Sequence, residues 1–264
     1  MVEMLDRILA GIDLRTAKQF QKTLEKAGAE IHLGRRLEEV VSYSDDGITI
    51  RLDDGTELSA EKLLVSIGRQ PQTRGIGLED AGIEVTDRGH VVVDEFLRTA
   101  NPKAWAVGDC IGGLQLAHLA SAEGARAAEN ILGPHMVPMD RTVVPACIYT
   151  HPEIATVGLN RDTAADAGIE VKSGQARFAG SGKALGEGEP DGFAQLVADA
   201  ETDLLLGATI MGAHAVEMIH EVGVAISDGY TMRDLGEIIH AHPTISEMVM
   251  DAAQQGEGVA PYLS

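Results

Sequence analysis

Leu63-Leu64-Val65-Ser66-Ile67-Gly68-Arg69-Gln70-Pro71 is the stretch from which we predict the fold class. Apart from Ser66, its first five residues are apolar. A strand formed by them would be apolar on both faces, which is typical of a strand buried on both sides. Gly68 and Pro71 end the run, because neither residue continues a regular strand well. The stretch therefore predicts an α/β protein whose sheet is covered on both faces.

The residues before this stretch predict a helix and a β-meander. Apolar residues recur at helical spacing from Leu14 to Ala27, and Gly28 follows where a helix commonly ends. Two Asp-Asp-Gly turns separate the strands of the meander. Strands are expected at residues 29–33, 37–44, 48–52 and 57–67, and Val2-Glu3 looks like the end of another strand.

A candidate binding edge follows residues 63–71. Trp105–Val107 is expected to form a short strand with Gly108 and Asp109 at its carboxyl end, where ligands of open α/β sheets collect. Leu116 and Ala117 begin a helix whose first N–H groups would attract an electron-rich oxygen. Asp109 can equally be a turn or N-cap aspartate, and that interpretation stays open.

Residues 133–139 contain two prolines and a Gly-Pro break, which mark a domain boundary. The mixture of strand and helix patterns beyond it predicts an α+β domain with one antiparallel sheet. Strands are expected at residues 143–149, 170–178, 192–199 and 204–211, and helices at residues 163–168, 216–229 and 232–239. The segment 215–227 is apolar on several faces, which favours an oligomer interface.

The segment His240-Ala241-His242-Pro243-Thr244-Ile245-Ser246-Glu247 carries the most distinctive chemistry. His242 precedes a proline and is expected on extended backbone, while Thr244 and Glu247 form a Thr-x-x-Glu capping box. A carboxylate bonded to one ring nitrogen fixes the tautomer and makes the other nitrogen a better base. Alternatively, Glu247 only caps the helix and His242 is a polar loop residue. A zinc site at His240 and His242 is less favoured, because nearby residues do not complete it.

The composition excludes several classes of function. The 264 residues include 21 basic and 41 acidic ones, which gives a formal net charge of −20. This charge disfavours nucleic acid and anionic membranes as partners, because both require basic patches. Cys110 and Cys147 match no metal or redox spacing, so we expect two reduced cysteines, no metal site and a cytoplasmic location.

Six segments together carry a family resemblance. They are Val65-Ser-Ile-Gly-Arg-Gln-Pro71, Thr99 to Asp109 with its Ala-Val-Gly-Asp end, Leu116 to Gly124, Tyr149 to Gly158, Gly212 to Glu221, and His240 to Glu247. In this order they resemble the carboxyl-terminal part of the dihydrolipoamide dehydrogenases, which are pyridine nucleotide–disulfide oxidoreductases. Tyr149-Thr-His-Pro-Glu and His-Pro-Thr-Ile-Ser-Glu favour this group over the glutathione or mercuric reductases.

The resemblance implies partial Rossmann-like domains followed by an α+β interface domain. Residues 1–72 would be a remnant of the NAD-binding domain, and residues 73–141 the carboxyl-terminal part of the FAD-binding domain. Residues 142–264 would be the interface or dimerisation domain. It also implies a homodimer formed through this last domain and a lipoyl-bearing protein as substrate.

The resemblance further implies roles for particular residues. His242 would exchange protons with a cysteine thiol and the dithiol substrate in the partner subunit, and Glu247 would orient it. Asp109 would bond the ribityl chain of FAD, and Glu3 would hold the adenosine ribose of NAD. The other cofactor contacts would be Gly108, Leu116 and Ala117 for FAD, and Leu37, Ser66, Ile67, Gly68 and Arg69 for NAD.

Two motifs of the family are missing from the sequence. It contains no Cys-x4-Cys pair, which would carry electrons between dithiol and flavin, and no Gly-x-Gly-x-x-Gly phosphate-binding loop. We therefore expect a truncated chain that has no dihydrolipoamide dehydrogenase activity by itself. The alternatives are a non-catalytic dimerisation fragment and one chain of a split enzyme.

Overall fold

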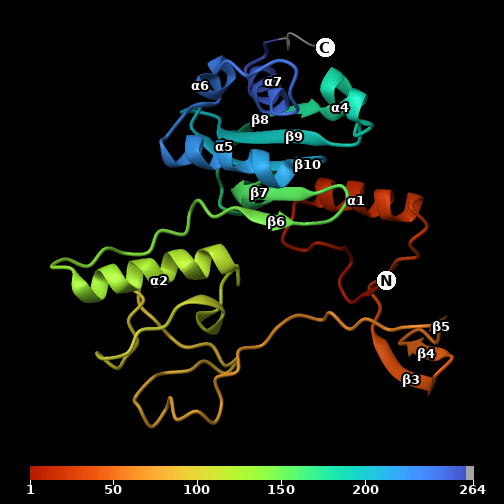
Figure 1. Cartoon of the computed structure of the whole chain (residues 1–264), viewed down its shortest axis with the longest axis vertical. Helices are drawn as coiled ribbons and strands as arrows, with labels where there is room; N and C mark the ends of the chain where they lie inside the picture. The colour runs from red at the N-terminus through yellow and green to blue at the C-terminus, as the bar shows by residue number, and fades with distance from the viewer. Residues whose placement is uncertain (260–264) are drawn as a thin grey trace. The chain divides into compact units, whose positions relative to one another are not determined.

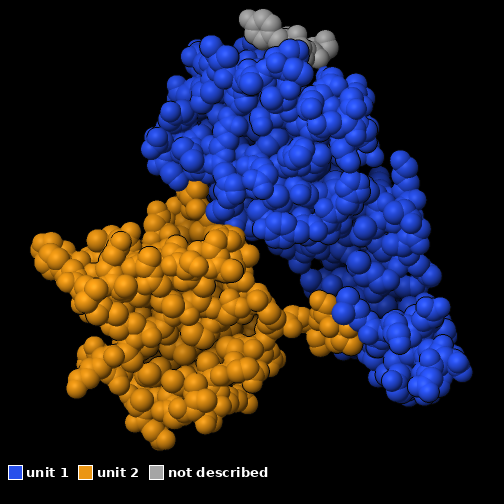
Figure 2. Space-filling view, viewed as in Figure 1, with its two compact units in different colours: residues 1–64, 145–264 blue, residues 65–144 orange. Residues whose placement is uncertain are grey.

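A computed structural model describes residues 1–259 (Figure 1). The chain divides into two compact units, Val65–Val144 and a larger unit made of Met1–Leu64 with Pro145–Ser264 (Figure 2). The domain limits at residues 72 and 141 remain a prediction, and residues 260–264 of the expected interface domain lie outside the described part. Within residues 1–259, every helix is too short or too polar to traverse a bilayer.

A five-stranded antiparallel sheet forms the centre of the larger unit. Its strands, in spatial order, are β6 (Ala146–Ile148), β7 (Ile154–Gly158), β10 (Leu205–Met211), β9 (Phe193–Asp199) and β8 (Val171–Arg177). The expected antiparallel sheet is confirmed, including four of its strands. The sequence pattern does not predict β7, which is short and follows directly on Pro152 and Glu153.

Helices cover this sheet and position the His240–Glu247 segment. α5 (Ala215–Ser227) packs on β7 and β10, α7 (Glu247–Gly256) packs on β8 and β9, and α6 (Met232–Glu237) packs on α7. α3 (Arg161–Asp166) was expected, whereas α4 (Gly182–Glu187) was not. A Cβ atom on Gly174 of β8 would lie 1.9 Å from the Ala252 carbonyl oxygen, so only glycine lets α7 lie this close to β8.

The amino-terminal segment shares a core with the five-stranded sheet. Parallel strands β1 (Val2–Glu3) and β2 (His32–Leu33) flank α1 (Leu14–Lys26), which confirms the expected helix. Cross-strand pairing places Ile154, Met211 and Phe193 side by side, and Ile8 and Phe20 pack against these three. Burial of these apolar side chains therefore joins α1 to the sheet.

The meander forms, but the stretch expected to be its buried strand does not. β3 (Leu37–Ser44), β4 (Gly47–Leu52) and β5 (Glu57–Ala60) make a three-stranded antiparallel sheet. The prediction that the last strand continues to Ile67 is wrong, because β5 ends at Ala60 and Ile67 is 92% exposed. A strand buried on both faces requires neighbours and covering layers, and no strand within residues 1–259 pairs with this run.

The smaller unit consists mainly of loops around α2 (Ala117–Leu132). The start of this helix agrees with the sequence pattern. The expected strand at Trp105–Val107 is wrong, since only Trp105 pairs, in an isolated bridge with Arg98. Gly108 and Asp109 instead belong to a short 3-10 helix, η1 (Gly108–Ile111), because no neighbouring strand in the described residues extends that bridge into a ladder.

Replacing Phe20 by alanine tests whether α1 belongs to the core of the sheet. Phe20 is 3% exposed, so we expect Phe20→Ala to lower the free energy of unfolding by about 3–5 kcal/mol, measured by urea denaturation. Leu14→Ala on the same helix is the control; Leu14 is 40% exposed, and its replacement should cost about 1 kcal/mol or less. Equal effects of the two replacements would contradict the packing described here.

Candidate functional site

The structure brings His242 and Glu247 into direct contact. Glu247 is the first residue of α7 and is 5% exposed. Its Oε1 atom lies 3.0 Å from His242 Nδ1, and its Oε2 atom accepts a 2.8 Å hydrogen bond from the Thr244 backbone N–H. A carboxylate at Nδ1 favours the Nδ1–H tautomer, which leaves Nε2 to exchange a proton. The side chain of His242 is 65% exposed, so solutes can reach this nitrogen.

The expected capping box forms only in part. Glu247 reaches back to the Thr244 N–H, as a capping box requires. The Thr244 hydroxyl, however, donates to the Ala241 carbonyl oxygen at 2.8 Å, and the helix begins at Glu247 with Ser246 as its N-cap. The prediction of Thr244 as the cap is therefore wrong, because its hydroxyl is engaged by Ala241 and the helix begins later than expected, at Glu247.

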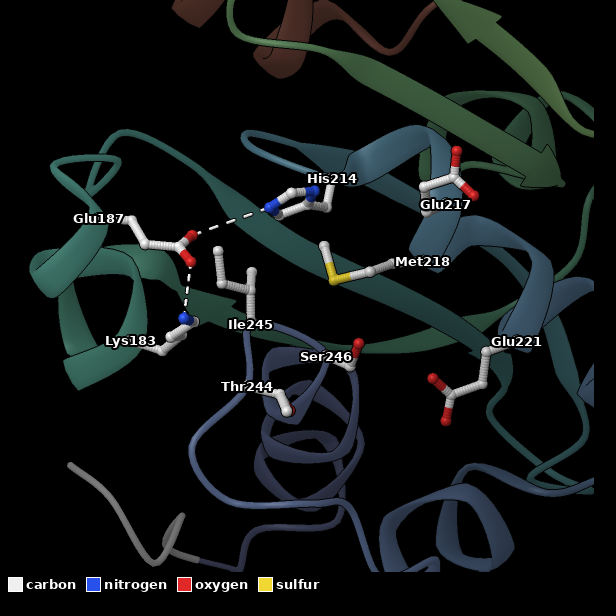
Figure 3. Close-up of a pocket in the computed structure, with 9 residues that line it drawn as sticks. All are labelled: Lys183, Glu187, His214, Glu217, Met218, Glu221, Thr244, Ile245 and Ser246. Carbon is white, nitrogen blue, oxygen red and sulfur yellow. Dashed lines mark ion pairs between the residues drawn. The ribbon is translucent and has the colours of Figure 1, made fainter.

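The histidine and the carboxylate lie in a groove of about 540 Å³. His240, Met250, Gln254 and residues 236–239 complete its lining. A second hollow of about 360 Å³ lies between α4, α5 and the start of α7, and Figure 3 shows Glu187 between Lys183 and His214 at one end of it. Among the described residues, no group of three or more His, Cys, Asp or Glu side chains is arranged to hold a metal ion.

Asp109 and Arg69 form an ion pair in the smaller unit. Arg69 Nη1 lies 2.9 Å from Asp109 Oδ2, and Arg69 Nη2 donates to the Gln115 carbonyl oxygen at 2.7 Å. The Asp109 side chain remains 45% exposed, so its carboxylate can also accept a hydrogen bond from a hydroxyl group. The family resemblance assigns these two residues to different cofactors, whereas the structure places them together.

Gly108 is fixed against α2 by a residue that the sequence analysis missed. Glu123 is 2% exposed; its Oε2 atom accepts from the Gly108 N–H at 2.8 Å, and its Oε1 atom lies 2.8 Å from Arg141 Nη2. Gly108 has a φ of +75°, and a Cβ atom there would lie 3.1 Å from Ala120 Cβ. A buried carboxylate on a helix of ordinary composition has no distinctive spacing, so the sequence offers no signal for it.

The start of α2 is suited to an electron-rich group. Leu116 is the N-cap on extended backbone without a side-chain cap, and Ala117 is the first helical residue. Backbone N–H groups in a first helical turn have no acceptor within the helix and can bind ligand oxygens. Together with the carboxylate of Asp109, these groups have the polarity to fit the hydroxyl and carbonyl groups of a flavin nucleotide.

The residues expected to contact NAD fall in two units. Glu3 ends the parallel strand β1, and its Oε1 atom accepts from the Leu5 N–H at 2.8 Å, while Leu37 is half-exposed at the start of β3. The carboxylate at the end of a parallel strand fits the hydroxyl groups of a ribose. Ser66, Ile67, Gly68 and Arg69 lie in the smaller unit and are exposed.

Two family models match this chain. Residues 1–124 match the pyridine nucleotide-disulphide oxidoreductase model, and residues 144–253 match the dimerisation domain of the same family. The chain belongs to the pyridine nucleotide-disulphide oxidoreductases. The family resemblance in the sequence motifs and the partial α/β fold with an interface domain are thereby confirmed.

Relatives within this family agree with the assignment. The chain is 44% identical over 264 residues to a dihydrolipoyl dehydrogenase of Bacillus subtilis, covering 98% of this chain and 56% of the relative. It is 42% identical over 265 residues to one of Haloferax volcanii, covering 98% and 55% respectively. The chain thus spans about half the length of the curated relatives it matches.

Solved structures of the family superpose well on this chain. LpdA from Mycobacterium tuberculosis aligns with a TM-score of 0.89 at 26% identity, over 96% of this chain and 55% of that one. The HOCl-induced flavoprotein disulfide reductase RclA from Escherichia coli aligns with the same TM-score at 27% identity, over 96% and 58%.

Removing the Glu123 carboxylate should loosen the turn at Gly108. We expect Glu123→Ala to destabilise the smaller unit by about 2–3 kcal/mol, because it leaves the Gly108 N–H and the Arg141 guanidinium without their acceptor. Limited proteolysis within residues 105–144 should accelerate. Glu129→Ala on the same helix removes a 65% exposed side chain and serves as the control; equal proteolysis of the two variants would contradict this role.

Proposed function

We propose that this chain is the carboxyl-terminal part of a dihydrolipoyl dehydrogenase, in which dihydrolipoamide and NAD yield lipoamide and NADH. The observation that carries the proposal is the 3.0 Å contact between His242 Nδ1 and a buried Glu247, with the ring exposed. Two relatives of 44% and 42% identity bear the name of this enzyme, which supports the choice of substrate.

In this proposal His242 is the acid–base of the dithiol half-reaction. Its Nε2 atom takes a proton from a substrate thiol, which makes the thiolate that attacks a disulfide. Glu247 stabilises the imidazolium that forms, and the Thr244 N–H holds the carboxylate in place. The redox disulfide would belong to the part of the relatives' length that this chain does not span.

We assign the cofactors by the same reasoning. FAD, when bound, transfers electrons between the disulfide and NAD. Asp109, Gly108, Leu116 and Ala117 would hold FAD, with the Asp109 carboxylate and the first turn of α2 as its polar contacts. Glu3, Leu37, Ser66, Ile67, Gly68 and Arg69 would contribute to the NAD site.

A homodimer and a lipoyl-bearing protein substrate complete the proposal. The match of residues 144–253 to a dimerisation domain supports the homodimer. A cytoplasmic location is consistent with Cys110 and Cys147, which are both free. The same dimerisation match favours the second candidate function, a non-catalytic dimerisation module. Such a module would purify colourless, whereas a chain that retains the flavin site would purify yellow.

Complementation tests the catalytic role. The chain alone should not reduce lipoamide with NADH, but mixing it with the part of the Bacillus subtilis relative that this chain does not span should produce activity. His242→Gln should lower kcat by about 10²–10⁴-fold, the usual contribution of a general acid–base. His135→Gln, at an exposed loop position, is the control. Full activity of the His242→Gln mixture would refute the proposal.

The oligomeric state tests the homodimer. We expect light scattering after size exclusion to give twice the mass of one chain, because residues 144–253 match a dimerisation domain. Ile239 is 96% exposed in the single chain, beside His240. Ile239→Asp should therefore shift the equilibrium towards the monomer, since it would bury a charge in an interface. Leu185→Asp, which also replaces an exposed apolar side chain, is the control. A monomeric parent chain would overturn the assignment.

A further inference from the structure

The two histidines of His240-Ala241-His242 lie in opposite surroundings. The side chain of His240 is 6% exposed, whereas that of His242 is 65% exposed. Both line the same groove. The proposed reaction uses only His242, so a buried imidazole two residues away from it has no assigned role.

Both ring nitrogens of His240 face oxygen acceptors. Nδ1 lies 3.0 Å from the Ile238 carbonyl oxygen, and Nε2 lies 2.7 Å from Oε1 of Glu221 on α5. The Nε2 contact is close but is not aligned as a hydrogen bond. A neutral imidazole carries only one N–H, so its bare nitrogen would direct a lone pair at an acceptor oxygen. Only the doubly protonated imidazolium is attracted to both oxygens.

The charged groups around His240 are acidic on both helices that face it. α5 contributes Glu221, and α7 contributes Glu247 and Asp251, while Glu237 at the end of α6 lines the same groove. The interaction with Glu221 raises the pKa of His240 above its ordinary value, against the opposing effect of burial. Burial raises the pKa of Asp251, which is 3% exposed. A positive charge on His240 would therefore offset the negative charge of these acidic side chains next to His242.

We propose that His240 is held as an imidazolium by Glu221 and the Ile238 carbonyl, and that it acts as a positioning residue for His242. This role rests on the proposed function of His242 as the acid–base. The Glu221–His240 ion pair ties the segment before His242 to α5, and Glu247 ties the segment after it to α7. The backbone of His242 is thus fixed from both sides, so that its ring meets the Glu247 carboxylate.

This arrangement sets a pH dependence with a definite sign. A histidine whose pKa is higher in the folded state stabilises the fold below its ordinary pKa, and this contribution is lost as the pH rises through the raised value. The segment from Ile238 to Thr244 should therefore loosen as the pH rises through the raised pKa of His240 and the ring loses its proton. The Thr244 N–H, which bonds Glu247 at 2.8 Å, reports this change.

Nuclear magnetic resonance of the ¹⁵N-labelled full chain tests the proposal without substrate or cofactor. At pH 7 both His240 ring nitrogens should carry protons, and the ring should titrate above the ordinary imidazole value of about 6.5. Exchange of the Thr244 amide, corrected for its intrinsic pH dependence, should accelerate about tenfold with the same midpoint. A neutral His240 at pH 7, or an exchange profile without that midpoint, would overturn the proposal.

Variants on α5 separate this role from general packing. Glu221→Gln should lower the His240 titration midpoint and accelerate Thr244 exchange about tenfold at pH 7. Glu217→Gln, at an exposed position one turn earlier on the same helix, should change neither quantity. Unchanged behaviour of Glu221→Gln would refute the proposal, and the titration of the parent chain decides it if that variant does not fold. If the complementation assay gives no lipoamide activity but His240 titrates as predicted, only the catalytic role of His242 is rejected, and the charged state of His240 stands.

Discussion

The candidate site depends on one buried carboxylate with two partners. Glu247 uses one oxygen for the His242 ring and the other for the Thr244 backbone N–H. A buried carboxylate requires such partners, since removing one leaves an uncompensated charge or acceptor. The position of Glu247 is in turn set by α7, whose backbone approaches β8 so closely that Gly174 admits no side chain. The orientation of His242 therefore follows from the packing of a helix on a sheet.

Local sequence patterns predict much of this arrangement. The His242–Glu247 contact spans only five residues, so the short segment Pro-Thr-Ile-Ser-Glu is enough to suggest that the two side chains lie close together. Four of the five strands of the antiparallel sheet are likewise visible in the sequence as apolar or alternating runs. The capping box fails in one detail, because the hydroxyl of Thr244 bonds to Ala241 in a turn that precedes the helix.

Features that need distant partners escape the same reasoning. The run Leu63–Ile67 has the composition of a buried strand and yet is largely exposed. Its apolar composition suits a buried strand, but composition does not show whether neighbouring strands are present to bury it. Glu123 and Glu221 look like ordinary acidic residues on helices. Each gains its role from a partner that lies well away in sequence, Arg141 for Glu123 and His240 for Glu221. No local spacing contains that information.

The larger unit contains both proposed acid–base residues, His242 and Glu247. Its core joins Ile8 and Phe20 to the sheet, and α5 and α7 of this unit supply the carboxylates around His240 and His242. In the proposed reaction, proton exchange at His242 needs only residues of this unit, whereas electron transfer needs a Cys-x4-Cys pair, which the sequence does not contain. The two halves of the proposed reaction therefore have separate physical requirements. Proton exchange requires a correctly oriented imidazole nitrogen, and electron transfer requires a redox-active cysteine pair close to it.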